Sequence, residues 1–150
     1  MVKIETKAYG SLEIESEDLI TFQEGLFAFE QYKKYALVKK DETSIFMWLQ
    51  CLDEKDLAFL IVSPNELISG YKPVIANELL ATIKLENIEA AEIFCICTVP
   101  ASQPEKMTIN LQGPLLVNRD EGLGGQFISA DDRHLVKTPV FELIEKDESA

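Results

Sequence analysis

Apolar and polar residues alternate in short runs along most of this chain, and a period of two is typical of β-strands. Val2 and Ile4 alternate with charged residues, and Leu12 and Ile14 repeat the pattern. Tyr9-Gly10 lies between the two runs and contains a residue type that readily forms turns. The sequence therefore predicts an antiparallel hairpin over its first residues.

More strand-like runs follow at short spacing, and prolines separate several of them. Proline cannot donate a hydrogen bond to a sheet, so it belongs at strand ends and edges. The predicted strands are about Leu19–Phe22, Tyr35–Lys39, Phe46–Leu52, Leu57–Ser63, Ile93–Val99, Met107–Leu111, Leu115–Asn118 and Gln126–Ser129. Between the last two lies Gly122-Leu-Gly124-Gly125, which we interpret as a flexible hairpin loop because no helix is expected after it to bind a phosphate.

Helical spacing is found in few segments, and one of them, Glu30–Lys34, fits only a single helical turn. Ala76–Leu85 places Leu79, Leu80 and Ile83 at helical spacing among good helix formers. Val140–Glu145 fits a short amphipathic helix and fits a strand almost equally well. Many strands with one or two short helices predict a mainly β fold, an antiparallel β-barrel-like single domain over residues 1–139. An acidic C-terminal tail over residues 140–150 follows it.

The charge balance limits the kinds of partner. The chain has 26 acidic and 14 basic residues and a net charge of −12. Nucleic acids and anionic membranes repel such a chain, whereas a basic protein attracts it; the alternative is that the acidity serves only solubility. The first residues lack the apolar segment of a secretion signal, and no apolar run approaches the roughly 20 residues that a membrane helix needs. We therefore expect a cytoplasmic protein that binds neither membranes nor nucleic acids directly.

The residues that commonly carry chemistry are few. Cys51, Cys95 and Cys97 are an odd set, and Cys95 and Cys97 share one strand face among apolar neighbours. They predict buried thiols, with no disulfide and no metal, because the Cys-x-x-Cys spacing of zinc sites is missing. His134, the only histidine, lies in a polar stretch without an evident nucleophile or orienting group. We therefore expect no enzyme activity and no cofactor.

Three motifs in a fixed order are similar to one known family. They are Phe22-Gln-Glu-Gly25-Leu26-Phe-Ala-Phe29-Glu30, then Phe46-Met-Trp-Leu49-Gln50-Cys-Leu with Leu57-Ala58-Phe59, then Thr108-Ile-Asn110-Leu111-Gln112-Gly-Pro114-Leu-Leu-Val117-Asn118 with Gly125-Gln126. In this order the chain resembles the bacterial flagellar assembly factor FliW family from about residue 2 to 138. The one notable departure is Phe27-Ala28, where the family commonly has Pro-Gly. A Pro-Gly pair sets a specific turn, and we do not expect Phe-Ala to set it.

The resemblance implies a non-enzymatic regulator with a β-barrel-like fold. Proteins of this kind bind newly made flagellin in the cytoplasm. They also bind and antagonise the RNA-binding translational repressor CsrA, so export of flagellin frees the factor to capture the repressor and flagellin translation rises. Two alternatives remain: a flagellin-specific chaperone without a translational role, and a small uncharacterised enzyme.

Polar residues at predicted strand ends are the candidates for contact with flagellin. Asn110, Gln112 and Asn118 need solvent, backbone or a ligand as partners, and Gly25 and Leu26 belong to the first motif. Gly25 equally fits a turn with positive φ. The motif phenylalanines are expected in the core instead: Phe22, Phe29, Phe46 and Phe59.

Acidic residues are the candidates for contact with the repressor, which must be basic because it binds RNA. We favour the tail, since Phe141 and Ile144 offer it apolar anchors. Its acids are Glu142, Glu145, Asp147 and Glu148. The alternative is the early cluster of Glu13, Glu15, Glu17 and Asp18.

Overall fold

The computed structural model describes residues 1–39 and 41–143, and its strands are short. Their bounds are β1 Val2–Thr6, β2 Gly10–Ile14, β3 Leu19–Phe22, β4 Lys34–Val38, β5 Phe46–Cys51, β6 Ala58–Val62, β7 Glu92–Thr98, β8 Thr108–Ile109, β9 Leu115–Asn118, β10 Leu123–Gln126 and β11 Thr138–Pro139. The helical turns are η1 Ser16–Asp18, η2 Pro64–Glu66, α1 Asn77–Leu80, η3 Ala81–Ile83, η4 Ile88–Ala90 and η5 Pro104–Lys106.

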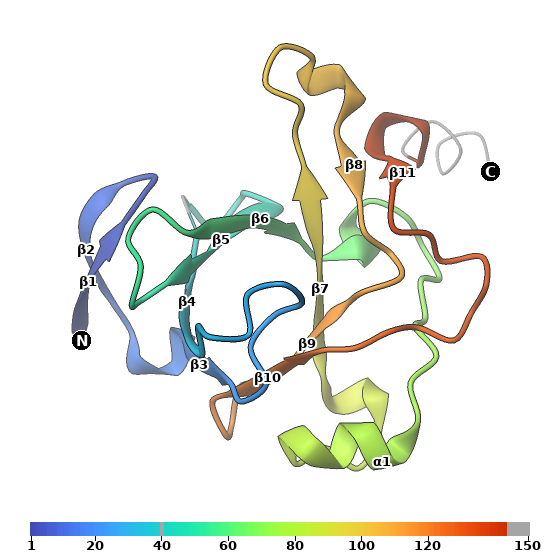
Figure 1. The fold of residues 1–150 in the computed structure, drawn as a ribbon, viewed down its shortest axis with the longest axis horizontal. Helices are drawn as coiled ribbons and strands as arrows, with labels where there is room; N and C mark the ends of the chain where they lie inside the picture. Colours follow the sequence, from blue (N-terminus) through green and yellow to red (C-terminus); the bar gives the residue numbers. More distant parts are fainter. Residues whose placement is uncertain (40, 144–150) are drawn as a thin grey trace.

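The strands from β3 to β10, without β8, close into a barrel-like ring (Figure 1). Their order is β7–β6–β5–β4–β3–β10–β9, and β9 pairs with β7 to close the ring. Closure removes unpaired edges, and it confirms the predicted mainly β, barrel-like fold. The pairings around the ring are antiparallel except one, because β3 and β10 pair in parallel. Those two strands are far apart in sequence, so no hairpin joins them.

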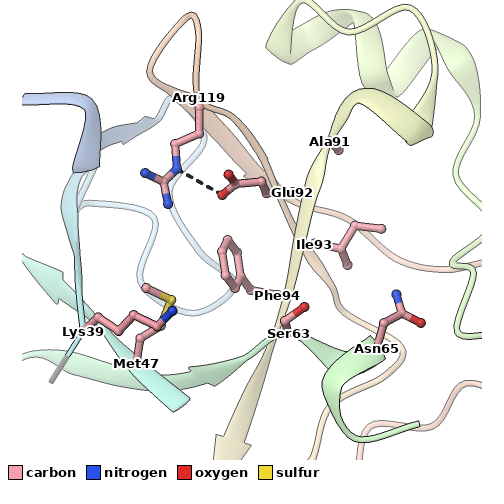
Figure 2. Close-up of a pocket in the computed structure, with 9 residues that line it drawn as sticks. All are labelled: Lys39, Met47, Ser63, Asn65, Ala91, Glu92, Ile93, Phe94 and Arg119. Atoms are coloured by element: carbon pink, nitrogen blue, oxygen red, sulfur yellow. Dashed lines mark hydrogen bonds and ion pairs between the residues drawn. The ribbon is translucent and has the colours of Figure 1, made fainter. Parts of the chain in front are cut away.

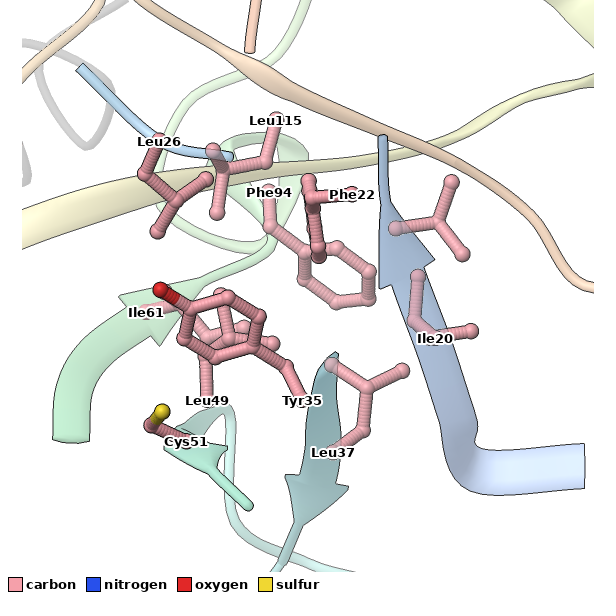
Figure 3. Packing of buried hydrophobic residues seen from close by; sticks show 11 residues of the cluster. Ile20, Phe22, Leu26, Tyr35, Leu37, Leu49, Cys51, Ile61, Phe94 and Leu115 are labelled. Atoms are coloured by element: carbon pink, nitrogen blue, oxygen red, sulfur yellow. The ribbon is translucent and has the colours of Figure 1, made fainter. Parts of the chain in front are cut away.

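Apolar side chains fill the inside of the ring (Figure 3). Alternate residues of a strand point to opposite faces, so β4 contributes Tyr35 and Leu37 and β3 contributes Ile20 and Phe22. The rings of Phe22 and Tyr35 meet edge to face, with their centroids 5.5 Å apart. Each large side chain buried in this way stabilises the fold by about 1.5–3 kcal/mol. The motif phenylalanines lie in this core or pack against it and its neighbour, as the sequence predicted: Phe22, Phe29, Phe46 and Phe59.

Smaller clusters cover the outside of the ring. The predicted hairpin forms from β1 and β2 and covers β4, with Ile4 and Ile14 packed on Ala36 and Val38. A second cluster joins β6, β7 and β8. The third lies between α1, η3 and the strands β9 and β10. Both faces of β9 are therefore buried, which explains why its sequence is apolar without alternation.

The predicted helix over Ala76–Leu85 forms as α1 followed at once by η3. Leu80 and Ile83 are buried against the barrel, as their spacing predicted. Leu79 shares the helical spacing in the sequence, but its side chain is exposed. The α1 turn is short and tightens into a 3₁₀ turn, so the α-helical spacing holds for only part of the segment.

Most predicted strands agree with the structure to within a residue or two at each end, but Gln126–Ser129 does not. The strand is instead β10, and two of the three glycines that the sequence assigned to a loop, Gly124 and Gly125, lie inside it. A Cβ on Gly124 would lie 2.8 Å from the Phe22 ring, and one on Gly125 would lie 2.7 Å from the Phe127 ring. These glycines therefore allow close packing rather than flexibility. The sequence also missed the two-residue strand β11, and it predicted β8 too long.

The barrel has two ends that differ in their residues. Each of the strands β3, β9 and β10 runs from one end of the barrel to the other. We call one end the loop end; it consists of the loop over residues 23–33, the turn over residues 110–114 and residues 126–128. We call the other the charged end; it includes Asp18 before β3, Glu92 at the start of β7 and Arg119 after β9.

Candidate functional site

Gln126 holds the loop end together. Its Oε1 accepts a hydrogen bond of 2.9 Å from the Phe27 amide, and its Nε2 donates one of 3.1 Å to the Gly113 carbonyl. The Asn110 Oδ1 accepts hydrogen bonds from the amides of Gln112 and Gly113 at 3.1 and 2.8 Å. Segments from the first and third motifs thus form one surface, although about ninety residues separate them in sequence.

A strained turn presents Phe27 on this surface. The Phe29 amide donates to the Leu26 carbonyl at 2.8 Å, and Ala28 has φ of +72°. A type II turn requires positive φ at this position, which glycine adopts readily and alanine rarely. The expectation that Phe27-Ala28 would not set a Pro-Gly-like turn is therefore wrong. The surrounding contacts impose the conformation, and Ala28 retains the strain.

Exposed apolar side chains and amides share the loop end. The Phe27 side chain is 48% exposed and Ile128 is 61% exposed, whereas Asn110 and Gln112 are half-buried. The Ser129 amide donates to the Gln112 carbonyl at 2.8 Å, which fixes the segment after β10 beside the turn. An exposed aromatic ring with amides around it, on a fixed backbone, suits protein recognition.

Three of the predicted contact residues are buried, contrary to the expectation of an exposed patch. Asn118 is 8% exposed, and its Nδ2 donates to the carbonyls of Ile83 and Lys84 at 2.9 and 3.3 Å. Leu26 is 1% exposed and lies in the barrel core. Gly25 has φ of +68°, and a Cβ there would lie 2.5 Å from the Glu30 Cα. Gly25 and Leu26 shape the loop end from beneath, whereas Asn118 ends β9 at the other end of the barrel, next to Arg119. Asn118→Ala would leave two carbonyls without their donor.

Arg119 organises the charged end. Its Nη1 lies 2.6 Å from the Asp18 Oδ1. Its Nε lies 3.0 Å from the Glu92 Oε2, the pair that Figure 2 shows. The guanidinium therefore joins the turn before β3 to the start of β7. Beside it lies a hollow of about 430 Å³, whose lining includes Lys39, Met47 and Phe94.

A second hollow of about 460 Å³ continues from the first. The two share Lys39, Met47 and Arg119, and together they form one groove, which we call the charged-end groove. The β1–β2 hairpin and η1 supply its far wall. Its carboxylates are Glu13, Glu15, Asp18, Glu42 and Glu92. Part of the acidic cluster predicted from sequence therefore lies along a groove rather than on a flat surface.

Comparison with known proteins decides the family. Residues 3–140 match the family described as FliW protein. The chain belongs to the FliW family. A protein named flagellar assembly factor FliW from Leptospira interrogans is 40% identical over 141 residues, covering 94% of both chains. Proteins of the same name are 36% identical in Lachnospira eligens and 34% in Thermotoga petrophila, over at least 93% of each chain.

A solved FliW structure has the same fold. A crystal structure of the flagellar assembly factor FliW superimposes with a TM-score of 0.82 at 25% identity, covering 93% of this chain and 96% of the other. The resemblance inferred from the three motifs is confirmed. FliW proteins are flagellar assembly factors rather than enzymes. Within residues 1–39 and 41–143, no helix is long and apolar enough to cross a membrane.

One group in this FliW family member superficially resembles a catalytic triad. The Ser129 Oγ lies 2.7 Å from the His134 Nδ1, and the Asp131 Oδ2 lies 3.8 Å from the His134 Nε2. The Ser129 Oγ also accepts a hydrogen bond of 3.0 Å from the Val74 amide, and Ser129 is only 4% exposed. A buried hydroxyl that already holds a backbone amide is not available as a nucleophile. The group instead joins the segment around Val74 to the segment after β10.

Burial lowers the pKa of His134 from its ordinary value of 6.5, against the charge of Asp131. The ring lies against Tyr71, with the centroids 4.7 Å apart. Although His134 lies in a polar stretch of the sequence, its side chain is mostly enclosed. Burial disfavours the charged form of the ring, so the neutral imidazole is favoured.

The cysteines are core residues, as predicted. Cys95 and Cys97 lie together in the cluster around β7 and β8, and Cys51 lies inside the ring. Burial raises the pKa of both Cys95 and Cys97 to about 12, so they stay protonated. Thiols in this state are poor nucleophiles and poor metal ligands. Within the part of the chain that the structure describes, no group of histidine, cysteine and acidic side chains forms a metal site.

The predicted acidic tail is described only in its first residues, where residues 140–143 are helical. Val140 is buried and Leu143 packs against the same cluster, so these two attach the segment to the barrel. Phe141, predicted as an anchor, is 47% exposed, and Glu142 is exposed. The remaining tail residues of the prediction lie outside the described residues: Ile144, Glu145, Asp147 and Glu148.

Sequence reasoning missed Phe27, Gln126 and Arg119. Phe27 was noted only as a departure from the family, and Gln126 only as part of a motif. Arg119 belongs to no pattern in the sequence, because its two partners, Asp18 and Glu92, are distant from it along the chain. The one signal available for Gln126 was its place in the third motif, directly after Gly124-Gly125.

Proposed function

We propose that this protein binds newly made flagellin in the cytoplasm and antagonises a CsrA-type translational repressor, so that flagellin synthesis follows flagellin export. Membership of the FliW family over residues 3–140 supports this proposal, because its relatives carry the name flagellar assembly factor. The observation that carries the flagellin half is the loop end, where the family motifs converge on an exposed Phe27.

The loop end has the properties that flagellin capture requires. Phe27 and Ile128 offer apolar area, and Asn110 and Gln112 offer amides beside it. A segment of flagellin that is disordered before assembly would fold onto this surface, and its ordering entropy would lower the affinity below what the buried area suggests. Gln126 fixes the backbone beforehand, so this protein orders little of its own chain on binding.

Charge supports the repressor half. An RNA-binding repressor carries a basic surface, and this chain has a net charge of −12. Opposite charge accelerates association and helps to exclude wrong partners. The tail acids Glu142, Glu145, Asp147 and Glu148 remain candidates for this contact, as the sequence suggested. A chaperone role without the repressor is the alternative, and it needs the loop end alone.

Calorimetry with monomeric flagellin tests the first half. The double variant Phe27→Ala, Gln112→Ala should lose about 10- to 100-fold in affinity, because aromatic anchors dominate binding energy. Tyr9→Ala is the matched control, since Tyr9 is also an exposed aromatic residue in a turn. Both variants should keep the wild-type unfolding temperature. Equal affinities for wild type, double variant and control would remove flagellin from the loop end.

Displacement of a labelled RNA from the repressor tests the second half. Added wild-type protein should reduce the fluorescence anisotropy of the RNA–repressor complex in proportion to its concentration. Binding of flagellin without any displacement of RNA would leave only the chaperone role.

A further inference from the structure

The charged-end groove combines apolar and acidic walls. Figure 2 shows Phe94 of β7 and Met47 of β5 pointing into the hollow, with Lys39 beside Met47 and Arg119 above. Leu12 of β2 continues the apolar lining into the second hollow. A groove of this kind accommodates side chains with an apolar stem and a charged tip, because each part meets its own environment.

Carboxylates outnumber cations along this groove. Arg119 faces two carboxylates, Asp18 and Glu92, at hydrogen-bonding distance, so its own charge is more than neutralised. Lys39 is exposed at the rim. The acids that line the groove without an ion pair to Arg119 are Glu13, Glu15 and Glu42, all exposed. The field inside the groove is therefore negative, and it attracts cations.

We propose that the charged-end groove receives a basic segment of a partner protein. Its Arg or Lys tips pair with Glu13, Glu15 and Glu42, and an apolar side chain or stem packs on Met47 and Phe94. The occupant follows from charge complementarity and from the apolar floor between the acids. The partner is the repressor of the proposed function, and the proposal rests on that function only for the identity of the partner.

The same geometry excludes other occupants. A phosphate or an acidic peptide would have to compete with Asp18 and Glu92 for Arg119, at 2.6 and 3.0 Å, and would face the remaining acids. The loop end offers a weaker field, because Phe27, Ile128, Asn110 and Gln112 are uncharged. Its charged residues are Glu24, Glu30 and Lys33, fewer than the five carboxylates of the groove. The basic partner and the loop-end partner therefore use opposite ends of the barrel.

Charge reversal on the two walls tests the proposal. The double variant Glu15→Lys, Glu42→Lys should weaken binding of the full-length protein to the repressor at least 10-fold in calorimetry. Glu78→Lys with Glu105→Lys is the control, since it makes the same change in net charge at exposed residues of α1 and η5. That control should weaken binding less than 3-fold. Thermal unfolding should show that both variants are folded.

A second variant tests the floor of the groove. Met47→Ala removes apolar contact without a change in charge, and it should weaken repressor binding several-fold while flagellin affinity stays at the wild-type value. If both double variants weaken binding equally, or Met47→Ala has no effect, the groove is not the site.

The proposal can fail separately from the proposed function. If the wild-type protein does not bind the repressor at all, the regulatory function is wrong. Binding at the groove is then tested by NMR with a synthetic peptide of alternating arginine and leucine. Chemical shift changes confined to residues of the groove, and lost in Glu15→Lys, Glu42→Lys, would support it. Shift changes spread over the whole acidic surface would overturn it.

Discussion

The two ends of the barrel are built on the same strands and yet present opposite chemistry. At the loop end, side-chain amides and a strained turn fix a surface whose centre, around Phe27, is apolar. At the charged end, Arg119 joins two carboxylates beside a groove with further acids. Because the barrel core tolerates any loop whose ends fit the strands, recognition is separated from stability. A short β-barrel can therefore offer one partner apolar area and another partner charge.

The largest effect on stability should come from adding a side chain at Gly25, where the loop end is tightly packed. Gly25→Ala should destabilise the protein by about 2–4 kcal/mol, because its Cβ would overlap the Glu30 backbone at a residue with positive φ. Gly10→Ala is the control, since Gly10 has φ of +69° with nothing within 4 Å of its added Cβ, and it should lose about 1 kcal/mol. Urea unfolding measures both. Equal losses would mean that the tight fit of the loop end contributes nothing.

The next largest effect should come from salt, which should weaken binding at the charged end more than binding at the loop end. Raising the ionic strength from 0.1 to 1 M shortens the Debye length from about 10 to about 3 Å. Repressor affinity should fall about 10-fold or more, whereas flagellin affinity should change less than about 3-fold, because only the charged end depends on exposed charges. Titrations of one protein preparation against each partner provide the comparison. Parallel salt slopes would contradict the assignment of charge to one end.

Relieving the strained turn should stabilise the loop end slightly. Ala28→Gly should raise the unfolding free energy by about 0.5–1 kcal/mol, because glycine adopts φ of +72° without strain. Ala76→Gly is the control, since Ala76 is exposed with φ of −63°, and it should lose stability through the added freedom of the unfolded chain. A loss of stability in Ala28→Gly would show that the turn is unstrained.

The smallest effect should come from His134. Its pKa is lowered in the folded state, so the unfolded state binds more protons, and the stability it contributes is lost as pH falls below its ordinary pKa of 6.5. The unfolding temperature of the wild type should therefore decline more between pH 7 and pH 5 than that of His134→Asn. Identical pH profiles would mean that the ring is as solvated in the folded state as in the unfolded state.

The sequence predicted the barrel better than it predicted either end. Short apolar runs between polar or turn residues identify strands because these side chains must enter a core, so β3 and β9 were predicted with their bounds. The strand β10 was missed because Gly124 and Gly125 are typical of loops, and only the facing rings explain them. Asn118 was mistaken for a surface residue because the carbonyls that need its amide come from a distant helical turn. Contacts between remote segments leave no local pattern.

The parallel pairing of β3 with β10 determines when the protein becomes competent during its synthesis. Thr21 lies opposite Leu123, roughly a hundred residues further along the chain, so the ring cannot close until most of the chain has left the ribosome. Gln126 follows this pairing and Arg119 immediately precedes it, so both ends are completed at the same late step. Nascent chains that have not yet formed β10 therefore lack both recognition surfaces, and such a half-made copy cannot sequester either partner.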